Sequence, residues 1–410
     1  MKDTRPLLSL DEALARLLAG ASPRRIAQGE TVATFDALGR VLAADVPSAL
    51  NVPPADNTSM DGYALRAADV PAAGAVLAVS QRIPAGVVGT PLLPGTAARI
   101  FTGGQVPPGA DAVVMQERCA ALAGEGLGQV RVDILPQVGQ WIRRAGEDVR
   151  EGDTVLAAGT RLTPQALGLA ASVGAATLPV LRRPRVALFS TGDELAMPGE
   201  PLKPGAIYNS NRYLLRGLLQ AGGCEVQDLG IVPDRLEATR DALRRAAAGS
   251  DLILTSGGVS VGEEDHLKPA VSAEGALDLW QVNMKPGKPL AFGHVGEALF
   301  MGLPGNPVSS FVTFLLAVAP VLRALQGMPT TGPLALSLRA DFDWPKPDRR
   351  REFLRARHNG AGGLALFDNQ SSGVLNSTVW ADGLVDISPG QVVQRGDAVR
   401  FLPMDSLVWR

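Results

Sequence analysis

The spacing of hydrophobic and polar positions changes several times along the chain, and each change predicts a different kind of structure. Ser9 and Glu12 form a capping-box pattern ahead of leucines at helical spacing, which predicts a helix that ends near Gly20. Residues 30–47 predict a strand, a short helix and a further extended segment. The next stretch, 51–63, contains too many turn-forming residues for regular structure.

Short apolar runs separated by Pro and Gly predict a small β-rich domain from residue 63 to about residue 141. Its strands are expected at 76–79, 98–101, 112–115 and 130–134. Beyond this region, Thr163 followed by Pro164 is typical of a helix start, and the Ala- and Leu-rich residues that follow predict a helix to about Val173. We expect this segment and the first 50 residues to form one discontinuous domain around the β-rich insertion.

Strands and helices alternate between residues 184 and 327, which is the pattern of a mainly parallel sheet covered by helices on both faces. The expected strands are 186–190, 226–232, 252–254, 278–282, 290–292 and 298–301, and the expected helices are 209–220, 234–248, 265–272 and 308–326. Strand spacing returns at 334–340, 352–357, 365–367, 383–387 and 398–402 and predicts a compact C-terminal β domain.

These patterns together predict a multidomain α/β plus β protein. The expected domains are a discontinuous N-terminal domain (1–50 plus 147–183), a β-rich insertion domain (51–146), a central βαβ domain with a mainly parallel sheet (184–327) and a C-terminal β domain (328–410).

Composition narrows the classes of function. The chain has 410 residues and a formal net charge of −2, so no overall basic field indicates binding to nucleic acid or to an anionic membrane. Cys119 and Cys224 are far apart and predict neither a disulfide framework nor a zinc ribbon. The N-terminal residues lack the apolar core of a signal peptide, and the apolar run 308–322 is shorter than a bilayer needs and contains Pro320. We therefore expect a cytoplasmic protein.

Candidate chemistry gathers first after the predicted strand 252–254. This strand leads into Ser256, Gly257 and Gly258, and adjacent glycines can adopt positive φ and let a ligand approach the backbone amides. Three acids follow, of which Asp265 is the last. A glycine turn beside carboxylates suits a phosphate held with a divalent cation. Taken alone, the pattern fits a plain strand-to-helix turn with solvated acids at least as well.

The ends of neighbouring strands favour the ligand site over the plain turn. Glu194 and Asp234 each follow a predicted strand, and Lys285 and Lys288 flank a Pro-Gly turn. Because the carboxyl ends of parallel strands meet at one edge of a sheet, we expect these groups to line one rim. Lysines bind phosphate as point charges, and carboxylates hold hydrated Mg²⁺. The rim therefore predicts a site for an anionic ligand.

Ordered motifs over nearly the whole chain resemble those of the MoeA/gephyrin family of molybdopterin molybdenumtransferases. They stand at 56–64 (DNTSMDGYA), 99–104 (RIFTGG), 109–117 (GADAVVMQE), 144–148 (RAGED), 189–195 (FSTGDEL), 256–265 (SGGVSVGEED), 284–289 (MKPGKP), 302–309 (GLPGNPVS) and 371–377 (SSGVLNS).

The resemblance implies an L-shaped subunit of four domains, with a central domain of the molybdopterin-binding type, that forms an elongated homodimer. It implies an enzyme that inserts molybdenum from molybdate into adenylylated molybdopterin with the assistance of Mg²⁺ and releases AMP. The molybdopterin adenylyltransferase and proteins that deliver the product to molybdoenzymes are the implied partners. Neither nucleic acid nor membrane is an expected partner.

Matching the motifs residue by residue assigns roles in this chain. Activity is expected of Asp61, Thr102, Asp148, Glu194, Asp234, Asp265 and Lys285. Substrate binding is expected of Ser256, Gly257, Gly258, Lys288, Pro304, Asn306, Pro307 and Ser372, and metal binding of Asp265, Glu194 and Asp234. Asp61 and Asp148 lie outside the central domain, so we expect them to reach the site across a dimer interface. Whether either is a general base or only caps a loop stays open.

Three other functions stay open from the sequence. One is a scaffold that clusters receptors, as gephyrin does. Another is a general nucleotide phosphotransferase, although the chain lacks a Walker-A loop. The third is the adenylylating enzyme, whose fold resembles residues 184–327 alone.

Overall fold

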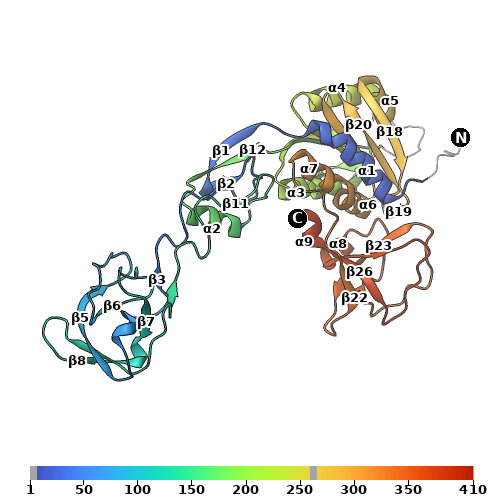
Figure 1. The fold of residues 1–410 in the computed structure, drawn as a ribbon. Helices are drawn as coiled ribbons and strands as arrows, with labels where there is room; N and C mark the ends of the chain where they lie inside the picture. The colour runs from blue at the N-terminus through green and yellow to red at the C-terminus, as the bar shows by residue number, and fades with distance from the viewer. Residues whose placement is uncertain (1–6, 259–265, 410) are drawn as a thin grey trace. The chain divides into compact units, whose positions relative to one another are not determined.

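The computed structural model describes residues 7–258 and 266–409, which fall into two compact units. The first unit comprises Met1–Glu30, Gly39–Ala43 and Val180–Arg410, and the second comprises Thr31–Leu38 and Ala44–Pro179. The strands β1 (Gly29–Ala33) and β12 (Thr177–Leu181) pair with each other where the chain passes from one unit to the other. Figure 1 labels many of these elements and colours the chain from blue at the N-terminus to red at the C-terminus.

A six-stranded sheet lies at the centre of the first unit, in the order β16-β13-β17-β21-β20-β18. Its strands are β13 (Arg185–Thr191), β16 (Glu225–Val232), β17 (Leu252–Ser256), β18 (Gly275–Gln281), β20 (Pro289–Val295) and β21 (Ala298–Leu303). The strands β16, β13, β17 and β21 are parallel, whereas β20 is antiparallel to both of its neighbours. The mainly parallel sheet is thus confirmed, and the reversal places the start of β20 beside the carboxyl end of β21.

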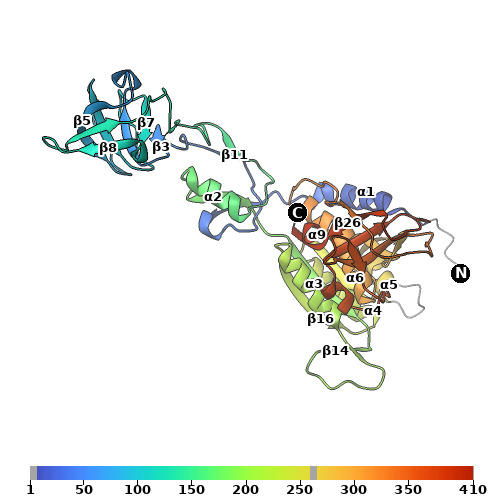
Figure 2. The same ribbon diagram turned by 90° about the horizontal axis from the view of Figure 1, so that it is seen from below.

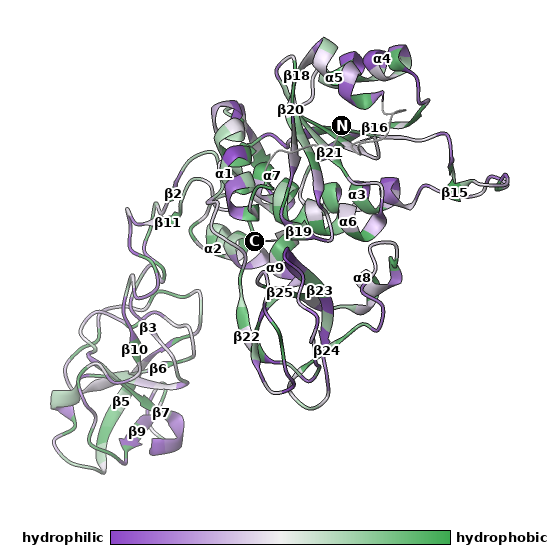
Figure 3. Ribbon diagram, turned by 90° about the vertical axis from the view of Figure 1, so that its right-hand side faces the viewer, coloured by the Kyte–Doolittle hydropathy of each residue, from purple (hydrophilic) through white to green (hydrophobic). Residues whose placement is uncertain are grey.

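Helices cover both faces of this sheet. One face packs against α1 (Leu10–Ala21), α3 (Ser210–Ala221), α6 (Pro307–Thr313) and α7 (Ala319–Leu325), and the other packs against α4 (Leu236–Ala247) and α5 (Leu267–Glu274). Figure 3 shows hydrophobic residues along the strands and hydrophilic residues on α4 and α5. This distribution follows from burial of the sheet between two helical layers.

The first helix begins with the predicted capping box. The Ser9 hydroxyl accepts a hydrogen bond from the Glu12 N–H at 3.1 Å, and the Glu12 carboxylate accepts one from the Ser9 N–H at 2.9 Å. Its apolar face, including Leu10 and Leu17, packs into the core of the first unit beside α7. Residues 147–179, with which we expected this helix to form a domain, belong to the second unit. The bounds of four separate domains stay a prediction.

The expected helix near the end of this fold is interrupted. A π-helical segment, Phe314–Val318, separates α6 from α7. Pro320 stands in the first turn of α7 and has no N–H to donate to the carbonyl of Leu316, which explains a local change of register. In the described part of the chain, 307–325 is the one stretch of helix long and apolar enough to cross a membrane. Because 83 % of its 18-residue apolar window is buried, it fits a core helix equally well.

A second six-stranded sheet forms the C-terminal part of the first unit. It contains β19 (Met284–Lys285), β22 (Leu336–Arg339), β23 (Arg351–His358), β24 (Leu364–Leu366), β25 (Gly383–Ile387) and β26 (Ala398–Pro403). The expected strands are present, and α8 (Asn376–Trp380) and α9 (Met404–Trp409) are additional. The short strand β19 comes from the α/β segment and pairs in parallel with β23, so that Lys285 lies opposite Glu352.

The second unit is built on the predicted β-rich region. Its six-stranded sheet has the order β7-β4-β6-β5-β9-β8, with strands β4 (Gly62–Leu65), β5 (Ala75–Ile83), β6 (Thr96–Ile100), β7 (Ala112–Met115), β8 (Cys119–Leu122) and β9 (Gln129–Val132). Short pairs join β3 (Asn57–Thr58) to β10 (Ile142–Arg143) and β2 (Val46–Pro47) to β11 (Thr154–Leu156). The helix α2 (Pro164–Ser172) is capped by Thr163, as predicted.

Candidate active site

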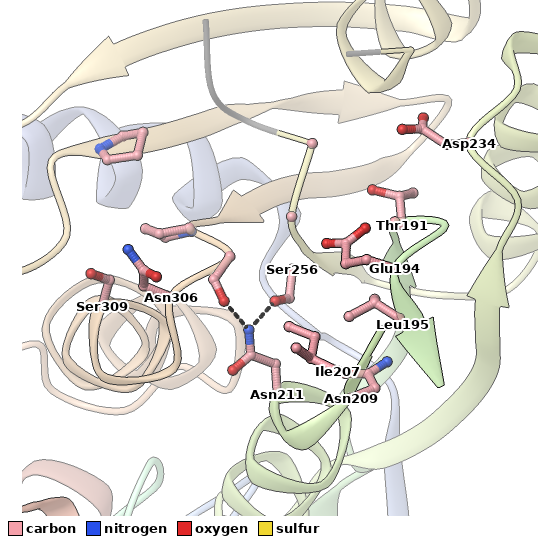
Figure 4. A pocket seen from close by; sticks show the side chains of 16 residues that line it. Thr191, Glu194, Leu195, Ile207, Asn209, Asn211, Asp234, Ser256, Asn306 and Ser309 are labelled. Carbon is pink, nitrogen blue, oxygen red and sulfur yellow. Dashed lines mark hydrogen bonds between the residues drawn. The ribbon is translucent and has the colours of Figure 1, made fainter. Parts of the chain in front are cut away.

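A cavity of about 520 Å³ opens at the carboxyl edge of the parallel strands in the first unit. Thr191 ends β13, Ser256 ends β17, Pro304 follows β21 and Pro289 begins the reversed strand β20, and all four line the cavity. Figure 4 shows these elements converging around it. The sheet therefore gathers its strand ends into one site, as expected of a parallel α/β fold.

The two glycines after β17 have the predicted left-handed backbone. Gly257 has φ +92° and Gly258 has φ +66°, and both line the cavity. A Cβ atom on Gly257 would lie 2.9 Å from the carbonyl oxygen of Thr191, so glycine is also required by space. The Gly257 N–H donates to the carbonyl of Leu303 at 3.1 Å and is not available to a ligand. The Gly258 N–H donates to no other described residue, so it is a candidate donor to a ligand.

Two asparagines at the start of α3 supply polar atoms that the sequence reasoning missed. Asn211 donates through Nδ2 to Ser256 Oγ and to the Gly305 carbonyl, both at 2.7 Å (Figure 4). Its Oδ1 and the Nδ2 of Asn209 are buried without a hydrogen-bond partner among the described residues. Unpaired buried polar atoms are costly, so a cavity lined by them is suited to a polar ligand. The sequence predicted only a helix beginning here, and Asn209 is its N-cap.

Glu194 and Asp234 line the same cavity, as predicted from the strand ends. The Glu194 carboxylate lies over Gly192, where a Cβ atom would meet Glu194 Oε2 at 2.6 Å. The Asp234 N–H donates to the Asp193 carboxylate at 3.3 Å. Neither lysine nor arginine is among the described residues that line the cavity. Glu194 and Asp234 are therefore the charged side chains among the described lining residues.

Carboxylates such as these can bind a metal ion, but the described residues do not form a complete set of metal ligands. No group of three or more His, Cys, Asp or Glu side chains in 7–258 and 266–409 could hold a metal ion together. Asp265, the third predicted ligand, lies outside the described residues. Glu194 and Asp234 offer hard oxygen donors of the kind that Mg²⁺ takes, usually with several waters.

Lys285 lines a different cavity, of about 260 Å³, between the α/β segment and the C-terminal sheet. Its Nζ lies 2.9 Å from Glu352 Oε1 and 3.4 Å from Asp348 Oδ2. Glu352 is buried and also accepts a hydrogen bond from Trp344 Nε1 at 2.9 Å. The Arg350 guanidinium beside Asp348 holds the pKa of that carboxyl well below its ordinary value. The predicted single rim is thus divided between two cavities.

Arg355, on β23, lines this second cavity and is fully buried. Within the described residues its guanidinium donates to neutral acceptors, namely Ser377 Oγ at 3.1 Å and the carbonyls of Phe353 and Ser371 at 3.3 Å. Burial lowers its pKa to about 10, so the group stays charged near neutral pH. A buried cation without a recorded carboxylate partner in the described chain is suited to an anionic ligand. No sequence motif had marked Arg355.

The remaining predicted binding residues lie beside these cavities. Asn306 and Pro304 line the first cavity, and Pro307 follows Asn306 as the first residue of α6. Lys288 precedes the lining residue Pro289, and its carbonyl accepts from the Val282 N–H at 2.8 Å. The carbonyl of Ser372 accepts from the Val308 N–H at 3.0 Å. This last bond ties the C-terminal sheet to the start of α6.

Three predicted residues belong to the second unit. Asp61 Oδ1 accepts from the Thr102 N–H at 2.8 Å and from the Thr102 hydroxyl at 2.7 Å. These two bonds, in that order, lower the pKa of Asp61. Asp148 is exposed, and its N–H donates to the carbonyl of Val52 at 3.0 Å. The structure therefore brings Asp61 and Thr102 together as one polar pair.

Three family models match successive parts of the chain. The MoeA N-terminal region (domains I and II) matches residues 8–174, a probable molybdopterin binding domain matches 187–324, and the MoeA C-terminal region (domain IV) matches 337–404.

Relatives and solved structures agree with these matches. A molybdopterin molybdenumtransferase of Haemophilus influenzae is 42% identical over 78% of this chain and 78% of its own length. Molybdopterin molybdenumtransferase 2 of Mycobacterium tuberculosis is 40% identical over 89% of this chain and 92% of its own length. The crystal structure of a molybdopterin biosynthesis MoeA protein from Pyrococcus horikoshii OT3 is 30% identical and has a TM-score of 0.83, covering 97% of this chain and 100% of that one.

Proposed function

The chain belongs to the MoeA family, and from this premise we propose that it is a molybdopterin molybdenumtransferase. In the proposed reaction, molybdenum from molybdate enters the dithiolene of adenylylated molybdopterin, and AMP is released. One structural observation carries the proposal: a single unit holds an acidic cavity beside a glycine turn and a second cavity lined by a buried, charged arginine.

The first cavity is the proposed site for adenylylated molybdopterin. Its volume of about 520 Å³ is within the usual range for small-molecule sites. Asn209 Nδ2 and Asn211 Oδ1 offer one donor and one acceptor without recorded partners in the described chain, which suits the polar edge of a heterocycle. The turn at Gly257 and Gly258 lets a phosphate approach the backbone.

A divalent cation in this cavity is the second part of the proposal. Glu194 and Asp234 both line the cavity, so a cation held by these carboxylates would offset the negative charge of an anionic substrate bound beside them. We assign Glu194 and Asp234 as ligands, with Asp265 as the further one expected from sequence. Bound there, Mg²⁺ would offset the negative charge that develops on the departing phosphate.

Molybdate, a tetrahedral dianion, is proposed to occupy the second cavity. Arg355 provides planar N–H donors, and Lys285 provides a point charge. Lys285 is already paired with Glu352 and Asp348, so Arg355 contributes the larger share of uncompensated charge. A dianion of this size fits within about 260 Å³.

Residues of the second unit are proposed to act on the substrate in a homodimer. In this arrangement Asp61, Thr102 and Asp148 of one subunit complete the site of its partner. Mixing an Asp61→Ala subunit with a Glu194→Gln subunit tests this proposal, because each variant alone lacks one half of the site. Recovery of activity to about a quarter of the wild-type value or less supports it, because roughly half of randomly mixed dimers are mixed and each has one intact site. No recovery contradicts it.

We further place the enzyme in the cytoplasm, where it would receive its substrate from the molybdopterin adenylyltransferase. Proteins that deliver the product to molybdoenzymes would be its partners downstream. Crosslinking followed by identification of the bound proteins in the native host tests both interactions.

The reaction itself is tested with purified protein, adenylylated molybdopterin, molybdate and Mg²⁺. AMP release that requires molybdate and stops with a chelator is expected. AMP release without molybdate would indicate simple hydrolysis, and no release from the folded protein would refute the assignment.

Two variants separate the roles of the cavities. Asn211→Ala is expected to raise KM for adenylylated molybdopterin, and Arg355→Met is expected to raise the molybdate concentration required, each by about tenfold or more because a charged or buried hydrogen-bond partner is lost. Arg339→Met, at an exposed arginine of the same sheet, is the matched control and should change neither. If Asn211→Ala instead raised the molybdate requirement and Arg355→Met raised KM for adenylylated molybdopterin, the two ligands would be assigned to the wrong cavities.

A further inference from the structure

The second unit carries two arginines side by side on one face of its sheet. Arg82 on β5 and Arg99 on β6 are direct partners in a parallel pair, and Tyr63 on β4 is the antiparallel partner of Arg99. The three residues therefore form a row across adjacent strands on one face. Like charges directly opposite each other on a sheet are destabilising. The pairing of Arg82 with Arg99 therefore needs a physical explanation.

Phe101 lies against both arginines. The guanidinium carbon of Arg99 is 4.5 Å from the centroid of the Phe101 ring, and that of Arg82 is 4.8 Å from the same centroid. Arg99 also lies 5.2 Å from the ring of Tyr63. Both guanidinium groups therefore lie against one aromatic ring, that of Arg82 at an exposed position and that of Arg99 at a half-buried one. We call Arg82, Arg99 and Phe101 the arginine platform.

The two arginines differ in how their donors are used. Arg99 donates to the Gly62 carbonyl at 2.8 Å and to Gln116 Oε1 at 2.6 Å, which locks its position. Arg82 is exposed, and no hydrogen bond or ion pair of its guanidinium is recorded with any residue in 7–258 or 266–409. One cation is thus fixed, and a second cation stands next to it with its donors open to solvent.

Asp61 is an acid whose charge interacts with that of Arg99. Arg99 contributes to the lowered pKa of Asp61, after the two bonds from Thr102. The second guanidinium, that of Arg82, has no recorded carboxylate partner in the described chain. An anion bound here would feel repulsion from Asp61, so it needs both arginines together.

We propose that the arginine platform is a binding site for a phosphate group, separate from both cavities of the first unit. Two adjacent guanidinium groups present N–H donors that match tetrahedral oxyanions bearing more than one negative charge. The bound anion would relieve the repulsion between Arg82 and Arg99 that the fold imposes. The inference rests on the geometry of the second unit and does not require the proposed reaction.

Residue-resolved arginine modification of the full-length protein tests the proposal. Phenylglyoxal modifies exposed guanidinium groups, and mass spectrometry reports the rate at each arginine. With inorganic phosphate at five times its dissociation constant, the rate at Arg82 should fall about sixfold, because only the unoccupied fraction reacts. Arg131, which pairs with Asp133 on the same sheet, is the internal control and should not change. Chloride at equal ionic strength should protect neither arginine, and equal protection by chloride would overturn the proposal.

Variants locate the site. Arg82→Gln should remove the protection of Arg99, and because Arg82 is exposed without recorded hydrogen bonds, this variant should keep its fold. Arg131→Gln should leave the protection intact. Unchanged protection of Arg99 in Arg82→Gln would show that the two arginines do not share a ligand.

The last comparisons separate this site from the proposed reaction and identify the source of the phosphate. Protection of Arg82 should persist in Asn211→Ala, whose substitution alters the first cavity, and its loss there would overturn a separate site. AMP that protects at lower concentration than inorganic phosphate indicates a nucleotide, whereas equal concentrations indicate recognition of the phosphate group alone. Either of these two results supports a phosphate site at the platform. If neither AMP nor inorganic phosphate protects Arg82, the proposal is refuted, even if the enzyme releases AMP normally.

Discussion

Replacing Gly257 by alanine tests whether the turn at the edge of the sheet needs glycine for its backbone, for space, or for both. Gly249 offers a matched control, because its φ is +97° against +92° for Gly257, and no atom lies within 4 Å of a Cβ built there. Both glycines flank β17, so the amides of that strand report on both variants. The difference between the two variants isolates the contact.

The structure allows the magnitudes to be worked out. Each alanine must adopt a left-handed backbone, which costs about 1–2 kcal/mol. At Gly257 the new Cβ also lies 2.9 Å from the Thr191 carbonyl oxygen, and this carbonyl ends a strand that is paired on both sides. Overpacking against a backbone that cannot move away costs a further 1–3 kcal/mol, roughly. Gly257→Ala should therefore lose more stability than Gly249→Ala by that second amount.

Native-state hydrogen exchange of the β17 amides is the suitable assay, because a protein with several domains need not unfold in one step. We expect the opening free energy of β17 to fall in both variants, and further in Gly257→Ala. AMP release should be impaired only in Gly257→Ala, since Gly257 lines the first cavity and Gly249 does not. Equal losses of stability would show that the Thr191 carbonyl yields, and full activity of Gly257→Ala would refute the assignment of this turn to the substrate site.

Three further perturbations test other parts of the structure. Thr102→Val removes the hydroxyl bond that helps to lower the pKa of Asp61, so this pKa should rise. The acid limb of any pH–activity profile that depends on the Asp61 carboxylate should then move to higher pH. An unchanged profile would mean that Asp61 does not titrate in the reaction. Ser9→Ala should destabilise α1 by about 1 kcal/mol through loss of its cap, measured by hydrogen exchange in that helix; no change would show that packing alone holds the helix end. Asp386→Ala removes a buried carboxylate that accepts two bonds of 2.7 Å from Arg351, and should cost about 3–5 kcal/mol in urea unfolding of the C-terminal sheet; a cost under 1 kcal/mol would mean that solvent replaces the carboxylate.

Local patterns in the sequence determined much of the fold. The capping box at Ser9, the cap at Thr163 and the positive φ of Gly257 depend on neighbours a few residues away, and the structure confirms all three. The alternation of strands and helices likewise predicted the mainly parallel sheet. From that sheet followed the expectation that Glu194 and Asp234 lie at one edge, and both line the same cavity.

The surroundings of three site residues, Lys285, Arg355 and Asn211, were decided only by tertiary contacts. Lys285 leaves the expected rim because its two-residue strand joins the C-terminal sheet and places it opposite Glu352, 67 positions along the chain. Arg355 became a candidate ligand only through burial away from a recorded acid, which composition and spacing do not report. Asn211 owes its place in the first cavity to hydrogen bonds with Ser256 and with the Gly305 carbonyl. Periodicity and capping are properties of neighbouring residues, whereas the burial and pairing of a charge depend on segments that only the folded chain brings together.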